Sequence, residues 1–173
     1  MQTLRKKVKK PHLWNTTLLT IETFTTFNIN YYKKEKSMNC DDPIQILTSL
    51  PYNYTVEMAL SNNNVLRTPE GKAYNIKLLY NFINNVNSVV KDCILITYFG
   101  LDGPAQTSIL KYNGDTITLY TDNSRFSDIH NDTYSNVITE IYSETKNVHG
   151  ITVQNFYGVT KEALRLTIFS RIL

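Results

Sequence analysis

Apolar residues recur at intervals of three and four along residues 76–86, with polar residues between them. That period places them on one face of a helix, which Asn75 precedes as a candidate N-cap. Two shorter helices are predicted before it, over residues 43–50 and 55–61, the second capped by Thr55. The apolar face of the main helix consists of Ile76, Leu79, Phe82, Ile83 and Val86.

Strand patterns follow this helix. Residues 93–99 are β-branched and aromatic on both faces, which is typical of a central strand. Residues 107–112 and 115–121 flank Asn113-Gly114, the strongest short signal for a two-residue type I′ hairpin turn. That turn pairs Leu110 with Ile117. It predicts a core face containing Leu110, Ile117 and Leu119, and an opposite face that is more solvated.

A second hairpin is predicted over residues 137–146 and 151–158, after a polar loop. The last segment, residues 161–173, has Leu164, Ile168 and Ile172 at helical spacing, with Thr160 before it as a candidate cap. We therefore expect an α+β fold. It consists of an antiparallel β-meander of about five strands, with one or two helices before it and a C-terminal helix.

Charge is divided unevenly along the chain. Residues 1–37 carry eight Lys and Arg against two Glu, whereas all 173 residues together have a net charge of +3. We therefore expect a basic, poorly ordered arm at 1–37 and a single, mildly acidic domain at 38–173. The arm also holds Trp14 and two tyrosines, so nucleic acid or an anionic membrane surface is a candidate partner for the arm alone. The sequence leaves open whether Met1 or Met38 is the true start.

The two cysteines, Cys40 and Cys93, are not paired by any recognisable spacing, and we predict no disulfide between them. Residues 12–29 are too polar for the apolar part of a signal peptide, and no lipobox precedes Cys40. A cytoplasmic location is therefore favoured, with an exported or lipid-anchored location as the alternative.

Residues 54–158 resemble the bacterial domain of unknown function 4362. Four stretches carry the resemblance, at 54–59, 71–75, 94–97 together with 110–117, and 121–125. The resemblance implies the limits of a folded domain but no activity, because the family is uncharacterised. It also implies that many relatives are exported or lipid-anchored and have a cysteine near each end of the last hairpin. This chain has residues such as Ile138 and Gly158 at those places and departs from the family there.

The most polar cluster lies after the first hairpin, and its oxygen-bearing side chains alternate in the way that a Ca²⁺ loop requires. The cluster lacks the glycine and the closing glutamate of such a loop, so we predict turn-capping side chains and no metal. Asp122 is expected to hold Arg125 in a charge-assisted hydrogen bond at a structural corner, with a ligand or partner contact as the alternative. The candidate binding residues are Asp122, Asn123, Arg125, Asp128, His130 and Asp132.

No nucleotide-binding, metalloprotease, redox or nucleophile motif occurs in the sequence, so we predict no catalytic residue and no cofactor. The favoured function is a non-enzymatic binding or interaction module of an uncharacterised bacterial protein, with a protein among its candidate partners. One alternative is a small enzyme that uses the loop from Asp122 to Asp132. Another is a nucleic-acid or membrane-surface binder that acts through the basic arm.

Overall fold

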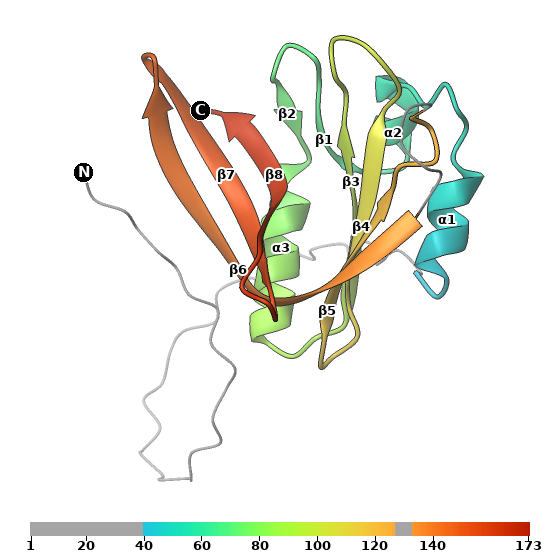
Figure 1. Ribbon diagram of the computed structural model, residues 1–173, viewed down its shortest axis with the longest axis vertical. Coiled ribbons are helices and arrows are strands. Elements are labelled where there is room, and N and C mark those ends of the chain that lie inside the picture. Colours follow the sequence, from blue (N-terminus) through green and yellow to red (C-terminus); the bar gives the residue numbers. More distant parts are fainter. Residues whose placement is uncertain (1–39, 127–132) are drawn as a thin grey trace, which may run out of the picture.

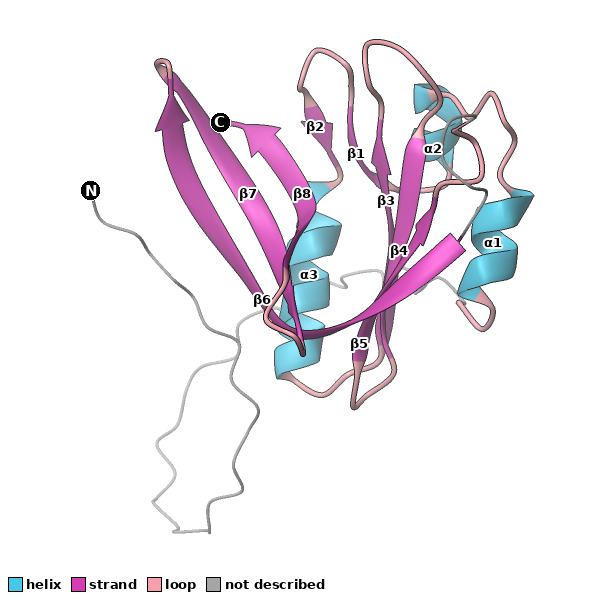
Figure 2. Ribbon diagram, in the orientation of Figure 1, coloured by secondary structure: helices cyan, strands magenta, loops and turns pink. Residues whose placement is uncertain are grey.

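The computed structural model describes residues 40–126 and 133–173, so the proposed arm lies outside the described residues (Figure 1). Three helices lie in the N-terminal half of the described chain, and the rest is almost entirely strand (Figure 2). The helices are α1 (Pro43–Ser49), α2 (Val56–Ser61) and α3 (Ile76–Asn87). The strands are β1 (Val65–Arg67), β2 (Ala73–Tyr74), β3 (Asp92–Tyr98), β4 (Gln106–Tyr112), β5 (Ile117–Asp122), β6 (Thr133–Val148), β7 (Ile151–Thr160) and β8 (Arg165–Ile172).

All eight described strands belong to one curled sheet with the order β2-β1-β3-β4-β5-β6-β7-β8. Every neighbouring pair is antiparallel except β1 and β3. These two run parallel, and the crossover connection that parallel strands need is formed by β2 and α3. The sheet forms a half-barrel, in which the long strand β6 joins β5 on one side to β7 on the other (Figure 1). The α+β class and the antiparallel meander are confirmed.

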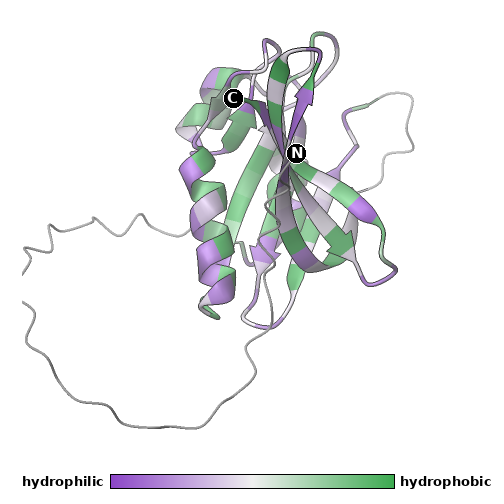
Figure 3. Cartoon of the chain, turned by 90° about the vertical axis from the view of Figure 1, so that its left-hand side faces the viewer, coloured by the Kyte–Doolittle hydropathy of each residue, from purple (hydrophilic) through white to green (hydrophobic). Residues whose placement is uncertain are grey.

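Helix α3 packs into the concave side of the half-barrel. Its predicted apolar face supplies Leu79 and Phe82, both fully buried, to a core that every strand from β3 to β8 also lines. Tyr80 extends this contact to the far wall, where its ring meets Phe156 of β7 edge-on. Asn75 precedes the helix as expected, but it adopts a left-handed conformation and its side chain donates to Asn64 O instead of capping. Hydrophilic residues lie on the outward side of α3 (Figure 3).

The convex face of the sheet is covered by the two shorter helices, both of which the sequence predicted, with α1 over β4 and β5 and α2 against β1. Asp42 caps α1 by accepting from Gln45 N, and Thr55 caps α2 by accepting from Met58 N. Leu47 of α1 packs on Ile109 of β4, and both are fully buried. The face of the first hairpin that was expected to be more solvated is therefore partly core.

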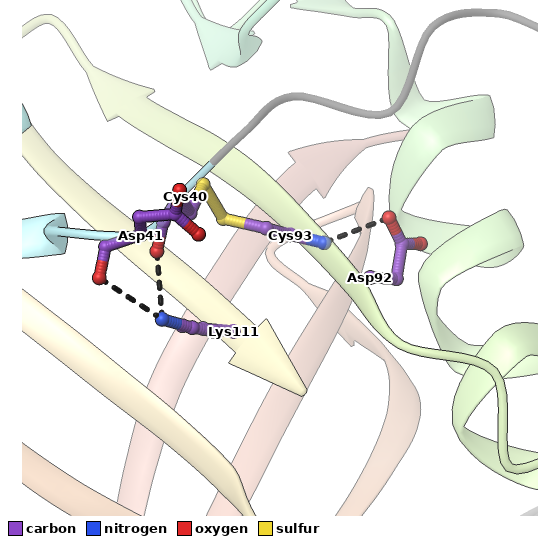
Figure 4. Close-up of a disulfide and its surroundings, with 5 residues drawn as sticks. All are labelled: Cys40, Asp41, Asp92, Cys93 and Lys111. Atoms are coloured by element: carbon purple, nitrogen blue, oxygen red, sulfur yellow. Dashed lines mark hydrogen bonds between the residues drawn. A yellow bond between two sulfur atoms is a disulfide. The ribbon is translucent and has the colours of Figure 1, made fainter. Parts of the chain in front are cut away.

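Cys40 and Cys93 form a disulfide across 53 residues of sequence, which contradicts our prediction of two free thiols (Figure 4). The bond holds the first described residue against the convex face of β3. Lys111 of β4 adds to this attachment, because its Nζ donates to Cys40 O at 2.7 Å. Cys93 is buried, as expected, but as half of a cross-link. Pairing distant cysteines depends on tertiary structure, which spacing alone does not reveal.

The first hairpin has a longer turn than predicted. Tyr112 pairs with Ile117 and Leu110 pairs with Leu119, so the register is two residues away from the predicted one. Gly114 has a positive φ of 101°, but Asn113 does not, and its Oδ1 accepts from the backbone N–H groups of Asp115 and Thr116 instead. A shift of two residues keeps each side chain on its face, so Leu110, Ile117 and Leu119 still face the core.

The second hairpin is confirmed and has the tight turn that the first lacks. Val148 pairs with Ile151, leaving two turn residues, His149 and Gly150, with φ values of 50° and 83°. Two consecutive positive φ values are the signature of a type I′ turn. Strand β6 also begins earlier than expected, at Thr133.

The predicted C-terminal helix is wrong, because residues Arg165–Ile172 form edge strand β8. The β7–β8 register shifts between Phe156 and Tyr157, and this irregularity leaves Ile168 without a pairing partner. Ile168 and Phe169 are adjacent, and both are buried in the concave core. A bulge of this kind breaks the alternation that marks a strand and leaves a spacing that resembles a helix.

Candidate functional site

Strands β1, β3 and β5 finish at the same end of the sheet and bring polar side chains together there. Parallel strands β1 and β3 finish at Arg67 and Tyr98, which are register partners. Tyr98 also pairs with Gln106 at the start of β4, and the neighbouring Thr107 pairs with Asp122 at the end of β5. Residues from segments more than 50 positions apart in the sequence therefore lie together at this end of the sheet.

A pocket of about 380 Å³ opens at this end of the sheet, between the ends of β3 and β4 on one side and β8 on the other. We call it the Tyr98 pocket. The loop that joins β3 to β4 supplies one wall, and the residue after the β5 corner, Phe126, supplies an aromatic surface. The lining residues are Tyr98, Gly100, Asp102, Pro104, Gln106, Phe126, Thr167 and Ser170.

Tyr98 connects the pocket to the core. Its ring lies 5.6 Å from the ring of Phe169 in β8, measured between centroids. Burial raises the pKa of Tyr98 to about 12, which the neighbouring Ser170 and Arg67 only partly offset. Its hydroxyl oxygen is itself buried and has no hydrogen-bond partner among the described residues, although the nearby Ser170 acts to lower its pKa. The hydroxyl is therefore neutral at physiological pH, and it is the ring of Tyr98 that faces the pocket.

Arg67 lies behind the wall formed by Ser170. Its Nη1 donates to Ser170 Oγ at 3.2 Å and so links β1 to β8 across the open side of the half-barrel. Its Nε is buried without a hydrogen-bond partner in the described part of the chain, and no carboxylate there forms an ion pair with it. Ser170 therefore lies between the Arg67 guanidinium and the Tyr98 hydroxyl and connects both to the pocket wall.

Asp122 and Arg125 lie beside this pocket at a buried corner. Arg125 Nη2 is 3.4 Å from Asp122 Oδ2, and the two side chains are only 5% and 1% exposed. Burial lowers the pKa of Arg125, while Asp122 and then Tyr54 act in the opposite direction. Asp122 Oδ1 also accepts from Ser124 N, which fixes the turn after β5. The two side chains form an ion pair, but Arg125 Nε, Nη1 and Nη2 are buried without a hydrogen bond among the described residues, so the expected charge-assisted hydrogen bond is not formed there.

The same predicted stretch does contribute to the pocket, through other residues. Asn123 Oδ1 accepts from Gln106 Nε2 at 3.4 Å and so orients a lining amide, and Phe126 lines the pocket directly. Asp128, His130 and Asp132 lie outside the described residues, so neither their binding role nor the alternative enzymatic use of this loop is tested. Among residues 40–126 and 133–173, no group of three or more His, Cys, Asp or Glu is placed to hold a metal.

A second group of buried polar residues lies at the same end of the sheet, on its convex side. Asn64, which is fully buried, donates from Nδ2 to Thr97 Oγ1 at 2.8 Å and to Tyr54 OH at 3.1 Å. Thr97 and Thr107 then form a hydrogen bond at 3.2 Å between β3 and β4. This network fixes α2 and the start of β1 against the sheet and thereby supports the strand ends that line the pocket.

Sequence reasoning missed most of the pocket. Thr167 and Ser170 were assigned to a helix, which would have placed them far from β3. Tyr98 lies within the strand predicted over residues 93–99, where nothing marks it as a site residue. The one available signal is the predicted stretch from Asp122 to Asp132, of which Asn123 contacts a lining residue and Phe126 lines the pocket.

Comparisons with models of protein families, with curated proteins and with solved structures give no match to this chain. The resemblance to the domain of unknown function 4362 therefore stays a prediction. None of the three described helices has the length and apolar character that crossing a bilayer requires.

Proposed function

We propose that this chain is a non-enzymatic binding module and that its ligand is a small molecule held in the Tyr98 pocket. The observation that carries the proposal is the pocket itself, which brings four hydrogen-bonding side chains, those of Asp102, Gln106, Thr167 and Ser170, together beside the rings of Tyr98 and Phe126. A concave site with a few convergent polar groups is the usual form of a small-molecule site, and its volume lies within the usual range of about 300–1,000 Å³.

The chemistry of the lining favours binding over catalysis. Among the described residues, its titratable side chains are Tyr98 and Asp102, and no described lining residue is a His, Cys or Lys that could act as a base or nucleophile near neutral pH. Ser170 accepts a hydrogen bond from Arg67, a group that cannot take its proton. The raised pKa of Tyr98 removes that hydroxyl from acid–base work at neutral pH as well.

The Cys40–Cys93 disulfide supports action in an oxidising compartment, outside the cytoplasm. This is the alternative to the location that the sequence favoured. The proposal predicts that the cross-link is present in protein isolated from its native host. Mass spectrometry after alkylation of free thiols tests this, and finding both cysteines alkylated without prior reduction would contradict it.

Binding in the pocket is tested with a matched pair of variants. Thr167 is exposed and lines the pocket, so Thr167→Trp should fill it without disturbing the core. Thr145 is an exposed strand threonine of β6 that does not line the pocket, so Thr145→Trp is the control. In a fragment screen by NMR, we expect ligands that perturb pocket residues in the wild type and in Thr145→Trp but not in Thr167→Trp. A screen in which no fragment perturbs a pocket residue would contradict the proposal.

A further inference from the structure

The Tyr98 pocket offers hydrogen-bond donors and acceptors in nearly equal measure. The Ser170 and Thr167 hydroxyls can each both donate and accept. Gln106 gives one N–H to Asn123 and keeps its carbonyl oxygen available as an acceptor. A ligand that matches this lining must itself present groups that donate and accept at several positions. Hydroxyl groups do so.

Charges of both signs lie near the lining, with the Asp102 carboxylate in the pocket wall and the Arg67 guanidinium behind Ser170. Each attracts the ion that the other repels, so their effects on an ionic ligand oppose each other and neither sign of charge is favoured. A fully apolar ligand is disfavoured, because it would desolvate the Gln106 amide and the Thr167 hydroxyl without giving them partners. A neutral, polar ligand fits this lining best.

Phe126 adds a flat apolar surface to this otherwise polar lining. A sugar ring has the complementary shape, since one face is formed by C–H groups while hydroxyls project around its rim. An aromatic side chain buries such a face, and the surrounding polar groups fix its orientation.

We infer that the Tyr98 pocket binds a neutral carbohydrate, at the size of one or two sugar rings, stacked on Phe126 and held by the side chains of Gln106, Thr167 and Ser170. This inference rests on the proposed function and names the ligand class of that same site. The Asp102 carboxylate repels an acidic sugar, whereas it can accept a hydrogen bond from the hydroxyl of a neutral one.

The experiment is saturation-transfer and chemical-shift NMR on the full chain with defined probes. The neutral set contains glucose, galactose, mannose, N-acetylglucosamine, maltose and lactose. Charged probes of the same size are glucuronate and glucosamine, and adenosine and glycine represent the nucleoside and the zwitterion. At least one neutral sugar should show saturable shifts at pocket residues. Its dissociation constant should be unchanged in Thr145→Trp, and its binding should be lost in Thr167→Trp.

Two further variants separate stacking from charge. Phe126→Leu keeps an apolar side chain but removes the ring, and we expect neutral sugar to bind about three- to tenfold more weakly. Asp102→Asn removes the carboxylate and should raise the affinity for glucuronate relative to that for glucose. Unchanged binding in Phe126→Leu would overturn the stacking arrangement and with it the inference.

The remaining outcomes are distinguishable. Pocket binding by adenosine, glycine or a charged probe, with none by a neutral sugar, overturns the carbohydrate inference and leaves the proposed binding function standing. Absence of any pocket perturbation, by these probes and by the fragment library, overturns both.

Discussion

Ile138 of β6 lies over Gly158 of β7 so closely that a Cβ atom at Gly158 would be 3.0 Å from Ile138 Cδ1. The Cδ1 atom of Ile168, from β8, is 3.1 Å from the same point. Side chains from both neighbouring strands, β6 and β8, therefore close over Gly158, and the missing side chain is what allows Ile138 and Ile168 to pack there.

Gly158→Ala should lower the free energy of unfolding by about 1–3 kcal/mol, which is the usual cost of overpacking a core. Urea denaturation measures it. The matched test is Gly158→Ala with Ile138→Val, because removing Cδ1 takes away the nearest contact. The double variant should lose less stability than the sum of the two single variants, and strict additivity would show that the contact relaxes at no cost.

Breaking the disulfide should destabilise the domain strongly. Closing a loop of 53 residues restricts the unfolded chain, which corresponds to roughly 4 kcal/mol in the chain-entropy account. We expect Cys40→Ala with Cys93→Ala to show a lower urea midpoint than the wild type. A reductant should lower the midpoint of the wild type and leave that of the double variant unchanged. Equal midpoints in oxidised and reduced wild-type protein would contradict the prediction.

Substituting either residue of the Asn113-Gly114 turn should lower the free energy of unfolding. Gly114→Val forces a β-branched residue to a positive φ and should cost about 1–3 kcal/mol. Asn113→Gly should also be destabilising, by about 1 kcal/mol, because it removes the acceptor for two backbone N–H groups. A two-residue type I′ turn would instead leave Asn113→Gly nearly neutral, so the urea midpoint of this variant distinguishes the two geometries.

The buried pair of Asp122 and Arg125 should behave as a unit. Arg125→Met leaves the Asp122 carboxylate buried without its cation and should cost about 3 kcal/mol or more. Asp122→Asn keeps an acceptor for Ser124 N while removing the charge. Adding it to Arg125→Met should therefore recover part of the lost stability in thermal or urea unfolding. If the double variant is less stable than Arg125→Met alone, the charges are not coupled.

Tyr98 should make the folded state more sensitive to alkaline pH. Its pKa is raised from 10.0 to about 12, so between those values the unfolded chain releases a proton that the folded chain retains. Its contribution to stability is therefore complete below pH 10 and is lost as the pH rises to about 12. Between pH 9 and pH 11 the wild type should lose about 1 kcal/mol more than Tyr98→Phe. Equal losses would mean that Tyr98 is ionised normally.

The helices and the central strands were predictable because their apolar spacing is local. Leu79 and Phe82 fall on one helical face whatever surrounds them, and Thr55 and the β-branched residues of β3 gave correct caps and strands. The turn at Asn113 shows the limit of this information. Its residue types indicated a hairpin, but the hydrogen bonds of one side chain decided its length.

The C-terminal strand and the pocket were not predictable, because both depend on contacts between distant residues. Ile168 and Phe169 point into the core together only because of the bulge opposite Phe156. A helix over residues 161–173, which the apolar spacing predicts, gives no reason to place Ser170 beside Arg67. The disulfide escaped prediction for the same reason, since nothing local marks Cys40 as a neighbour of β3.

The position of that disulfide also determines how the domain would respond to a mechanical pull between residue 40 and the C-terminus. Tension would pass through the sulfur bridge from Cys40 directly into β3 and bypass the intervening chain. The bypassed chain contains α1, α2, β1, β2 and α3, whose 53-residue span would otherwise extend by about 180 Å. Only the strands from β3 onward could lengthen under force, so reduction of one covalent bond would change the extensible part of the described domain from β3–β8 to the whole of it.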